Sequence, residues 1–249
     1  MITADEIKEA MLAAEPLLLR LQELYDRLPG TNCTCDQPGV CCTFLPEMTV
    51  LEALQWIKLM QTMSDSELSA KLRRFVEFYM TNPARLSGCP FKEDGVCTIY
   101  RYRTFGCRSY GLWSQEMGWM RTRESRNGKK ALRQMWKRYG VEIPSDIVEF
   151  EIDYCDKVQI QSGKTINDTM IMELLKNVYD LGKSLGDLQT RFEEEYHSDF
   201  SFFLASLFLG MRKALLLKFA VIKEMVQKGT NTRLQETLEK VSPDTIRSP

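Results

Sequence analysis

The chain has 249 residues, of which 44% are apolar and 27% charged, and these ordinary globular proportions exclude a mainly disordered or fibrous protein. Its 33 basic and 34 acidic residues give a net charge of −1, so no overall field attracts nucleic acid or a membrane surface. The charge is unevenly placed, because residues 101–138 hold eleven Lys or Arg and only two Asp or Glu.

Three helices are predicted in the N-terminal third, each starting at a Ser or Thr with Glu three residues later, the pattern of a capping box. The three pairs are Thr3 with Glu6, Thr49 with Glu52 and Ser64 with Glu67. Apolar residues at helical spacing follow each pair. Pro16 is expected to kink or divide the first helix, and Asn82-Pro83 to end the third.

Seven of the eight cysteines lie in two turn-rich segments, residues 32–43 and 87–110. In the second segment, Asp94-Gly95 predicts a tight turn in a short β-hairpin, which would bring Cys89 and Cys97 near each other. Residues 99–108 are expected to form a helical turn that carries Cys107.

The C-terminal half is predicted to be helical over residues 126–139, 168–196 and 199–227, with an extended segment over 143–160. We expect the last two helices to pack as a hairpin against the N-terminal helices. The most apolar stretch, 200–211, is too short to cross about 30 Å of hydrocarbon, so no membrane span is expected.

The predicted fold is therefore mainly α: a helical bundle enclosing a loop-rich, cysteine-lined metal site, with at most a short β-hairpin. We expect residues 1–140 to form a helical region whose metal-binding core is 33–110, and 141–240 to form a helical region packed on it. Residues 241–249 are expected to be a flexible tail.

The cysteines predict a metal site rather than disulfide bonds. The chain begins with the acidic, helix-like sequence Met1 to Glu6, so we expect no cleavable leader and a cytoplasmic, reducing location. Clustered thiols in such a compartment bind metal more often than they pair. The predicted ligands are the seven clustered cysteines: Cys33, Cys35, Cys41, Cys42, Cys89, Cys97 and Cys107.

The adjacent residues Cys41 and Cys42 limit the geometry of that site, because neighbouring side chains project in different directions. Either one of the two is a spare thiol, or the site holds two metal atoms. An iron–sulfur cluster offers separate irons as attachment points, and we favour it over zinc held in all-thiolate tetrahedral sites.

The second cysteine segment resembles the YkgJ-type cysteine-cluster family, described as zinc- or iron-chelating. The likeness is carried by Cys89-Pro90-Phe91, Gly95 to Tyr100, Arg103 and Cys107 to Tyr110, which follow the family core C-x-I-Y-x-x-R-P-x-x-C-R. The upstream cysteines are similar to its C-x-x-C-x-x-C-C element but are spaced C-x-C-x5-C-C. Thr104 replaces the family proline, which should loosen the turn without touching a ligand. The resemblance covers residues 33–110 and implies a metal-chelating domain.

Two other functions are weighed. The phrase Cys89 to Cys97 is also similar to flagellin lysine N-methylases, which would imply transfer of a methyl group from S-adenosylmethionine to protein lysines. The basic segment 101–138 is interleaved with aromatic residues, a pattern typical of nucleic-acid contact or of a site for an anionic ligand or protein partner. The alternative for this segment is a solvated face with its aromatics turned inward. The sequence assigns no catalytic residue.

Around the metal site, Arg103 and Arg108 are expected to donate to cluster sulfurs or to orient an anionic substrate, since positive neighbours tune such sites. Salt bridges to acidic helices are the alternative. Tyr100 and Tyr110 are expected to cover the site.

Overall fold

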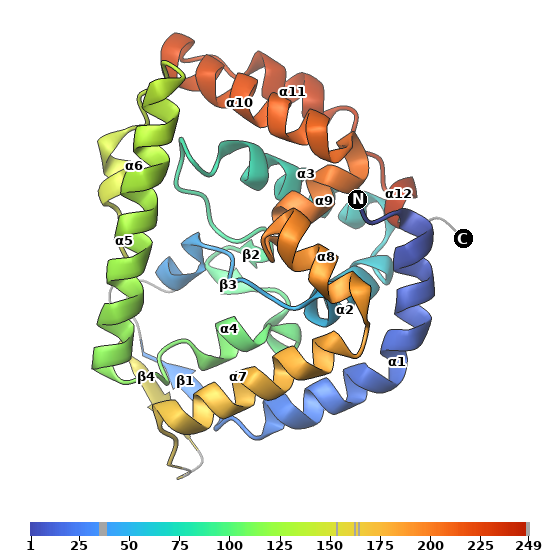
Figure 1. Cartoon of the computed structure of the whole chain (residues 1–249), viewed down its shortest axis with the longest axis vertical. Coiled ribbons are helices and arrows are strands. Elements are labelled where there is room, and N and C mark those ends of the chain that lie inside the picture. The colour runs from blue at the N-terminus through green and yellow to red at the C-terminus, as the bar shows by residue number, and fades with distance from the viewer. Residues whose placement is uncertain (35–38, 153, 162, 164, 248–249) are drawn as a thin grey trace.

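A computed structural model describes residues 1–34, 39–152, 154–161, 163 and 165–247 of the chain. The protein is mainly helical (Figure 1), as predicted. The first elements are α1 (Ala4–Asp26), β1 (Thr31–Cys33), η1 (Val40–Thr43), α2 (Val50–Gln61), α3 (Asp65–Thr81), β2 (Lys92–Glu93), β3 (Val96–Cys97), η2 (Tyr100–Tyr102) and α4 (Phe105–Ser109), where η marks a 3-10 helix. They are followed by α5 (Gln115–Arg138), α6 (Ser145–Glu149), β4 (Val158–Ile160), α7 (Asp168–Lys183), α8 (Asp187–Tyr196), α9 (Phe200–Leu209), α10 (Met211–Lys228), α11 (Thr232–Leu238) and α12 (Asp244–Arg247).

The three predicted helix starts are confirmed, because α1, α2 and α3 each begin with a complete capping box. In each box the Ser or Thr accepts from a backbone N–H while the Glu accepts from the capping residue. The α1 helix continues through Pro16 as a single element, and α3 ends at Thr81 with Asn82 as its C-cap.

The predicted β-hairpin is also confirmed. Strands β2 and β3 pair antiparallel, and the turn places both Asp94 (φ 48°) and Gly95 (φ 82°) in the left-handed region, as a two-residue hairpin turn requires. The structure adds a second pair that was not predicted: β1 pairs antiparallel with β4, joining Thr31 to Ile160. The expectation of at most one hairpin was therefore wrong, because this pairing joins distant segments.

Both long C-terminal helices predicted from the sequence are broken by glycine. Gly186 (φ 61°) separates α7 from α8, and Gly210 (φ 78°) separates α9 from α10, whose axes meet at 108°. The predicted hairpin of two long helices is therefore wrong. Instead, α7 packs on α1 and α2, whereas α10 packs on α3, α9 and α11.

Two further boundaries differ from the prediction. The helix expected over 126–139 begins earlier, at Gln115. Among its described residues, the segment 143–160 forms the strand β4 and also contains the short helix α6. Of the helices described, none is by itself long and apolar enough to cross a membrane. Helices α9 and α10 have the necessary length and composition only when taken together, and they are sharply bent at the break between them.

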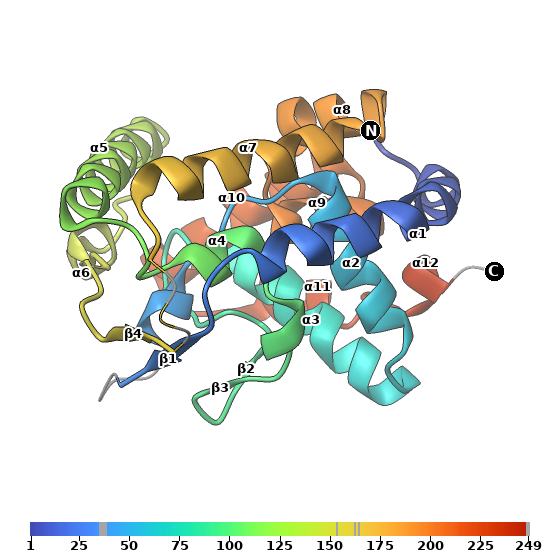
Figure 2. The ribbon, with the colours of Figure 1, turned by 90° about the horizontal axis from the view of Figure 1, so that it is seen from below.

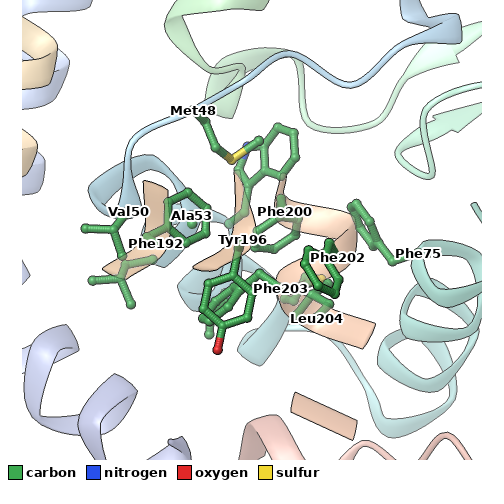
Figure 3. Packing of buried hydrophobic residues seen from close by; sticks show 14 of the residues in the cluster. Met48, Val50, Ala53, Phe75, Phe192, Tyr196, Phe200, Phe202, Phe203 and Leu204 are labelled. Carbon is green, nitrogen blue, oxygen red and sulfur yellow. The ribbon is translucent and has the colours of Figure 1, made fainter. Parts of the chain in front are cut away.

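A hydrophobic core draws on nearly the whole chain, from Ile2 to Ile246. Its centre is a group of aromatic rings in edge-to-face contact. Phe200 meets Trp56 and Phe75 with ring centroids 5.2 and 5.1 Å apart, and Figure 3 shows Phe200 and Phe75 among the packed side chains. Phe91, two residues after Cys89, packs its ring 5.0 Å from that of Trp56, so the cysteine-bearing segment is anchored in the core.

The division into regions 1–140, 141–240 and 241–249 remains a prediction. In the last of these segments, residues 244–247 form α12, and Ile246 is buried in the same core as the N-terminal residue Ile2. Arg247 forms an ion pair with Asp65 at 2.5 Å.

Replacing Gly210 with Ala should lower the free energy of unfolding by about 1–3 kcal/mol, because φ 78° with ψ 139° is a backbone conformation reserved for glycine. No atom lies within 4 Å of the added Cβ, so backbone strain alone causes the loss. Chemical denaturation followed by circular dichroism measures it. The control is Gly128→Ala, in the middle of α5 with open space around it, which should be neutral or stabilising by up to about 1 kcal/mol. Equal effects of the two substitutions on the free energy of unfolding would contradict a role for backbone strain at Gly210.

Candidate metal centre

Five cysteines from three separate chain segments lie together, and we refer to them as the cysteine cluster: Cys41, Cys42, Cys89, Cys97 and Cys107. Backbone contact joins the first two segments, since the N–H of Cys89 donates to the carbonyl of Cys42 at 2.7 Å. The thiol of Cys42 interacts electrostatically with those of Cys89, Cys97 and Cys107. The hairpin brings Cys89 and Cys97 near each other, as predicted, because Cys97 pairs with Lys92, whose N–H donates to the carbonyl of Cys89 at 2.8 Å.

The cluster is placed between the hydrophobic core and solvent. Cys89 and Cys97 pack against the core, whereas Cys41 is exposed. In Figure 2 the β2–β3 hairpin projects on the side of the molecule opposite α7 and α8. Figure 1 shows α4, which carries Cys107, between α5 and α1.

Of the two remaining predicted ligands, the structure describes only Cys33. Cys33 is exposed on β1, where it pairs with Val158 of β4. Cys35 lies outside the described residues. Cys33 and the five cluster cysteines carry free thiols. As the described side chains stand, no group of three or more His, Cys, Asp or Glu is arranged to hold a metal ion.

Burial governs the protonation of the inner thiols. It raises the pKa of Cys89 to about 12 and that of Cys107 to about 11, and neighbouring thiols add to both shifts. The hydrogen bond from Cys41 to Cys42 raises the pKa of Cys41 and lowers that of Cys42. Without a cation, Cys89 and Cys107 therefore remain protonated at neutral pH.

Two arginines, Arg103 and Arg108, lie beside the cluster, and the hydrogen bonds described for their guanidinium groups go to backbone carbonyls. The guanidinium of Arg103 stacks 3.6 Å from the ring centroid of Tyr100, and its positive charge acts on Cys41 and Cys107. Arg108 lies 4.5 Å over the ring of Tyr25 and donates to the carbonyl of Arg103 at 2.8 Å.

The two tyrosines expected to cover the site differ in exposure. The side chain of Tyr100 is 52% exposed and lies against Arg103, whereas Tyr110 is half-buried at the end of α4.

The side chain of Thr104 contradicts the expectation that it touches no predicted ligand. Its hydroxyl donates to the sulfur of Cys107 at 3.5 Å, so the residue in place of the family proline does touch a predicted ligand. It is buried at the N-cap of α4. A hydroxyl donor at this position favours the thiolate form of Cys107 and lowers its pKa against the effect of burial.

Glu52 has a buried carboxylate that supports the site, a role that the sequence did not predict. It accepts from the hydroxyl of Tyr25 at 2.6 Å, from the N–H of Phe105 at 2.7 Å and from the N–H of Thr49 at 2.9 Å. These bonds join α1, α2 and the start of α4, two residues before Cys107. The capping box with Thr49 predicted only the last of the three contacts.

Side chains of α2 and α3 also contact the second cysteine segment, residues 87–110. Lys71 donates to the carbonyl of Pro90 at 3.1 Å and pairs with Glu93 at 2.6 Å. The indole N–H of Trp56 donates to the carbonyl of Tyr102 at 2.8 Å. These three contacts attach the turn-rich segment to α2 and α3.

The basic segment 101–138 is largely the helix α5, which runs along one edge of the molecule (Figure 1). Three of its aromatic residues, Phe105, Trp113 and Trp136, are buried, whereas Trp119 is 58% exposed. The alternative, in which the aromatic side chains turn inward, therefore holds for these three residues and fails for Trp119 and for Tyr102, which is 44% exposed.

Comparison with known proteins provides no identification. No family model, curated protein or solved structure matches the chain. The similarities to the YkgJ-type family and to flagellin lysine N-methylases thus remain predictions, and function must be argued from the side chains.

Replacing Glu52 with Gln should lower the free energy of unfolding by about 1.5–3 kcal/mol, because the substitution removes a charged acceptor from three buried donors. Denaturant unfolding at neutral pH measures the change. The matched control is Glu67→Gln, which alters the same capping position on α3 at an exposed site and should cost less than about 1 kcal/mol. Similar losses at both positions would show that Glu52 acts only as a cap.

Proposed function

We propose that this protein binds a metal centre through four thiolates, those of Cys42, Cys89, Cys97 and Cys107. The observation that carries the proposal is that these half-buried thiols come together from three chain segments. The N–H of Cys89 donates to the carbonyl of Cys42 at 2.7 Å, Cys97 pairs with Lys92 in the hairpin, and Cys107 acts electrostatically on the other three thiols. Four cysteine thiolates are a complete ligand set for a zinc ion or for an iron–sulfur cluster. A cluster would suit electron transfer or redox sensing, whereas zinc would stabilise the fold.

The energetics of the buried thiols support the proposal. Cys89 and Cys107 lie where burial penalises the thiolate form, and each additional thiolate repels the others. A bound cation reverses both effects, because it replaces lost solvation and neutralises the sulfur charges. Metal binding would therefore release protons and tie together η1, the hairpin and α4.

The surrounding charges also match such a centre. Four thiolates around a divalent ion carry an excess of about two negative charges. Arg103 acts electrostatically on Cys107, and Lys71 acts on Cys89. Two positive charges therefore lie within range of the proposed ligands.

The proposal narrows the seven predicted ligands to four. The adjacent pair supplies one ligand only, since Cys42 faces the other thiols while Cys41 is exposed. Cys33 is left out because it is exposed on β1.

The test is elemental analysis of protein purified without oxygen, together with its visible absorption spectrum. Wild-type protein should contain stoichiometric zinc and be colourless, or contain iron and sulfide and absorb visible light. Cys42→Ser and Cys97→Ser should each lose most of the metal and lower the melting temperature, because a hydroxyl replaces a thiolate ligand. Cys33→Ser is the matched control and should keep both. Wild-type protein without metal, or serine variants with full metal content, would refute the proposal.

A second candidate function is supported by one feature of α5. Trp119, Arg123 and Lys130 fall on one helical stripe, which continues the i+4 and i+3 spacing through Arg126, Arg133 and Lys137. Glu151 pairs with Arg126, and Glu142 pairs with Arg133 and Lys137, which leaves the stripe with positive charge in excess. An exposed indole within a basic stripe is the surface on which bases of single-stranded nucleic acid stack.

Binding of a labelled single-stranded oligonucleotide tests this second function. The affinity should fall steeply as salt is raised, and Trp119→Ala should weaken binding by roughly fivefold or more, since a stacked base contributes about 1–3 kcal/mol. Met120→Ala is the control, an exposed apolar neighbour that lies off the stripe. Binding that is absent, or equal in the two variants, would exclude the function.

A further inference from the structure

A groove with apolar walls lies where the start of α1 meets α2, α9 and the C-terminal helix α12. Figure 1 shows α12 beside the first turns of α1. The volume of the groove is about 230 Å³. Among the described residues that line it, none belongs to the cysteine cluster or to the basic segment 101–138. Six apolar side chains form its walls: Ile7, Met11, Leu12, Ile57, Leu207 and Ile246.

The groove opens where the apolar stripe of α1 has its smallest side chain. Ala4, Ile7 and Met11 follow one another at helical spacing along the side of α1 that meets α2. Ala4 contributes only a methyl group, which leaves space at this end of the stripe. Leu12, at the same groove, is 78% exposed. A ligand in the groove would remove this side chain from water, which is favourable.

The wall that α12 provides is held in place by polar contacts. Nε2 of Gln61 donates to the carbonyl of Ile246 at 2.7 Å, and Arg247 pairs with Asp65 at 2.5 Å. The side chain of Ile246 is buried. Because these contacts fix α12 on α2 and on the start of α3, the groove has a formed shape, as small-molecule sites usually do.

Two polar side chains line the same groove, those of Lys8 and Gln61. Lys8 is exposed, and none of the ion pairs formed among the described residues includes it; the glutamates Glu6 and Glu15 of the same helix pair with other cations. The amide nitrogen of Gln61 carries a second N–H besides the one that it gives to α12. The groove therefore combines apolar walls with one cation and one amide donor, which suit a single anionic group.

From these observations we propose that the groove binds a medium-chain fatty carboxylate, with its hydrocarbon chain against the apolar walls and its carboxylate at Lys8 and Gln61. The volume sets the length of the chain. A water molecule takes up about 30 Å³ in the liquid, and a methylene group takes up a similar volume. The groove therefore holds roughly eight carbons. A helix of a partner protein, about 10 Å across, is too wide for this volume.

Calorimetric titration of the full chain with straight-chain carboxylates from butyrate to dodecanoate, below their micelle concentrations, tests the proposal. Binding should saturate at one ligand per chain. Each added methylene should tighten the Kd by about two- to fourfold, the gain expected from partial or full burial of one CH₂ group. The gain should stop at roughly eight carbons, when the groove is full. Absence of binding, or an affinity that keeps rising through dodecanoate without saturation, would overturn the proposal.

A variant that fills the groove places the ligand within it. Ala4→Trp adds a large side chain at the first turn of α1 and should abolish octanoate binding. Ala13→Trp is the matched control, because Ala13 is exposed on the same helix and does not line the groove. Both variants should keep the wild-type melting temperature. Equal octanoate binding by the two variants would exclude the groove as the site.

The role of the charge is tested separately from that of the apolar walls. Lys8→Gln should weaken octanoate binding by about two- to fivefold, the range of an exposed ion pair, and should leave the binding of 1-octanol unchanged. Lys213→Gln, at an exposed position of α10 outside the groove, should affect neither ligand. If Lys8→Gln weakens octanoate and octanol equally, or weakens neither, the assignment of a carboxylate to this groove is overturned.

Discussion

The buried carboxylate of Glu52 joins the helices on which the cysteine cluster is built. Removing a charge from water is costly unless donors replace the lost solvation. Here the donors come from α1, α2 and α4, so a displacement of α4 would take one of three donors away from the buried carboxylate. Burial, and after it the charge of Glu52, raises the pKa of Tyr25, which keeps its hydroxyl proton available for this bond. The ring of Tyr25 in turn lies under Arg108.

The other cysteine segments depend on apolar burial. Phe91 enters the core against Trp56 and Phe75, and Lys71 holds the carbonyl of the preceding Pro90. The turn-rich chain that follows Cys89 is therefore anchored on α2 and α3. This arrangement desolvates the inner thiols, and the same desolvation makes them costly as free thiolates and suitable for a cation. Stability of the core and the chemistry proposed for the site are thus linked.

Local features of the fold were predicted well where a few neighbouring residues decide the outcome. The capping boxes and the Asp94-Gly95 turn involve contacts within four residues, so sequence alone specifies them. The breaks at Gly186 and Gly210 were missed because an apolar stripe continues across each glycine. The function of Glu52 was seen only in part, since two of its three donors lie far away in the chain. The contact between Thr104 and Cys107 was missed because a family pattern describes residue types and not side-chain directions.

The amino-acid sequence by itself determined a mainly helical protein, the starts of α1, α2 and α3, and a concentration of thiols in two turn-rich segments. Periodicity and short-range hydrogen bonds are properties of neighbouring residues, which is why they can be read along the chain. Only the tertiary structure decided which thiols meet, that Cys42 faces inward while Cys41 faces solvent, and that β1 pairs with β4. Those outcomes depend on burial and on contacts between distant segments, and both arise only when the helices pack around their common core.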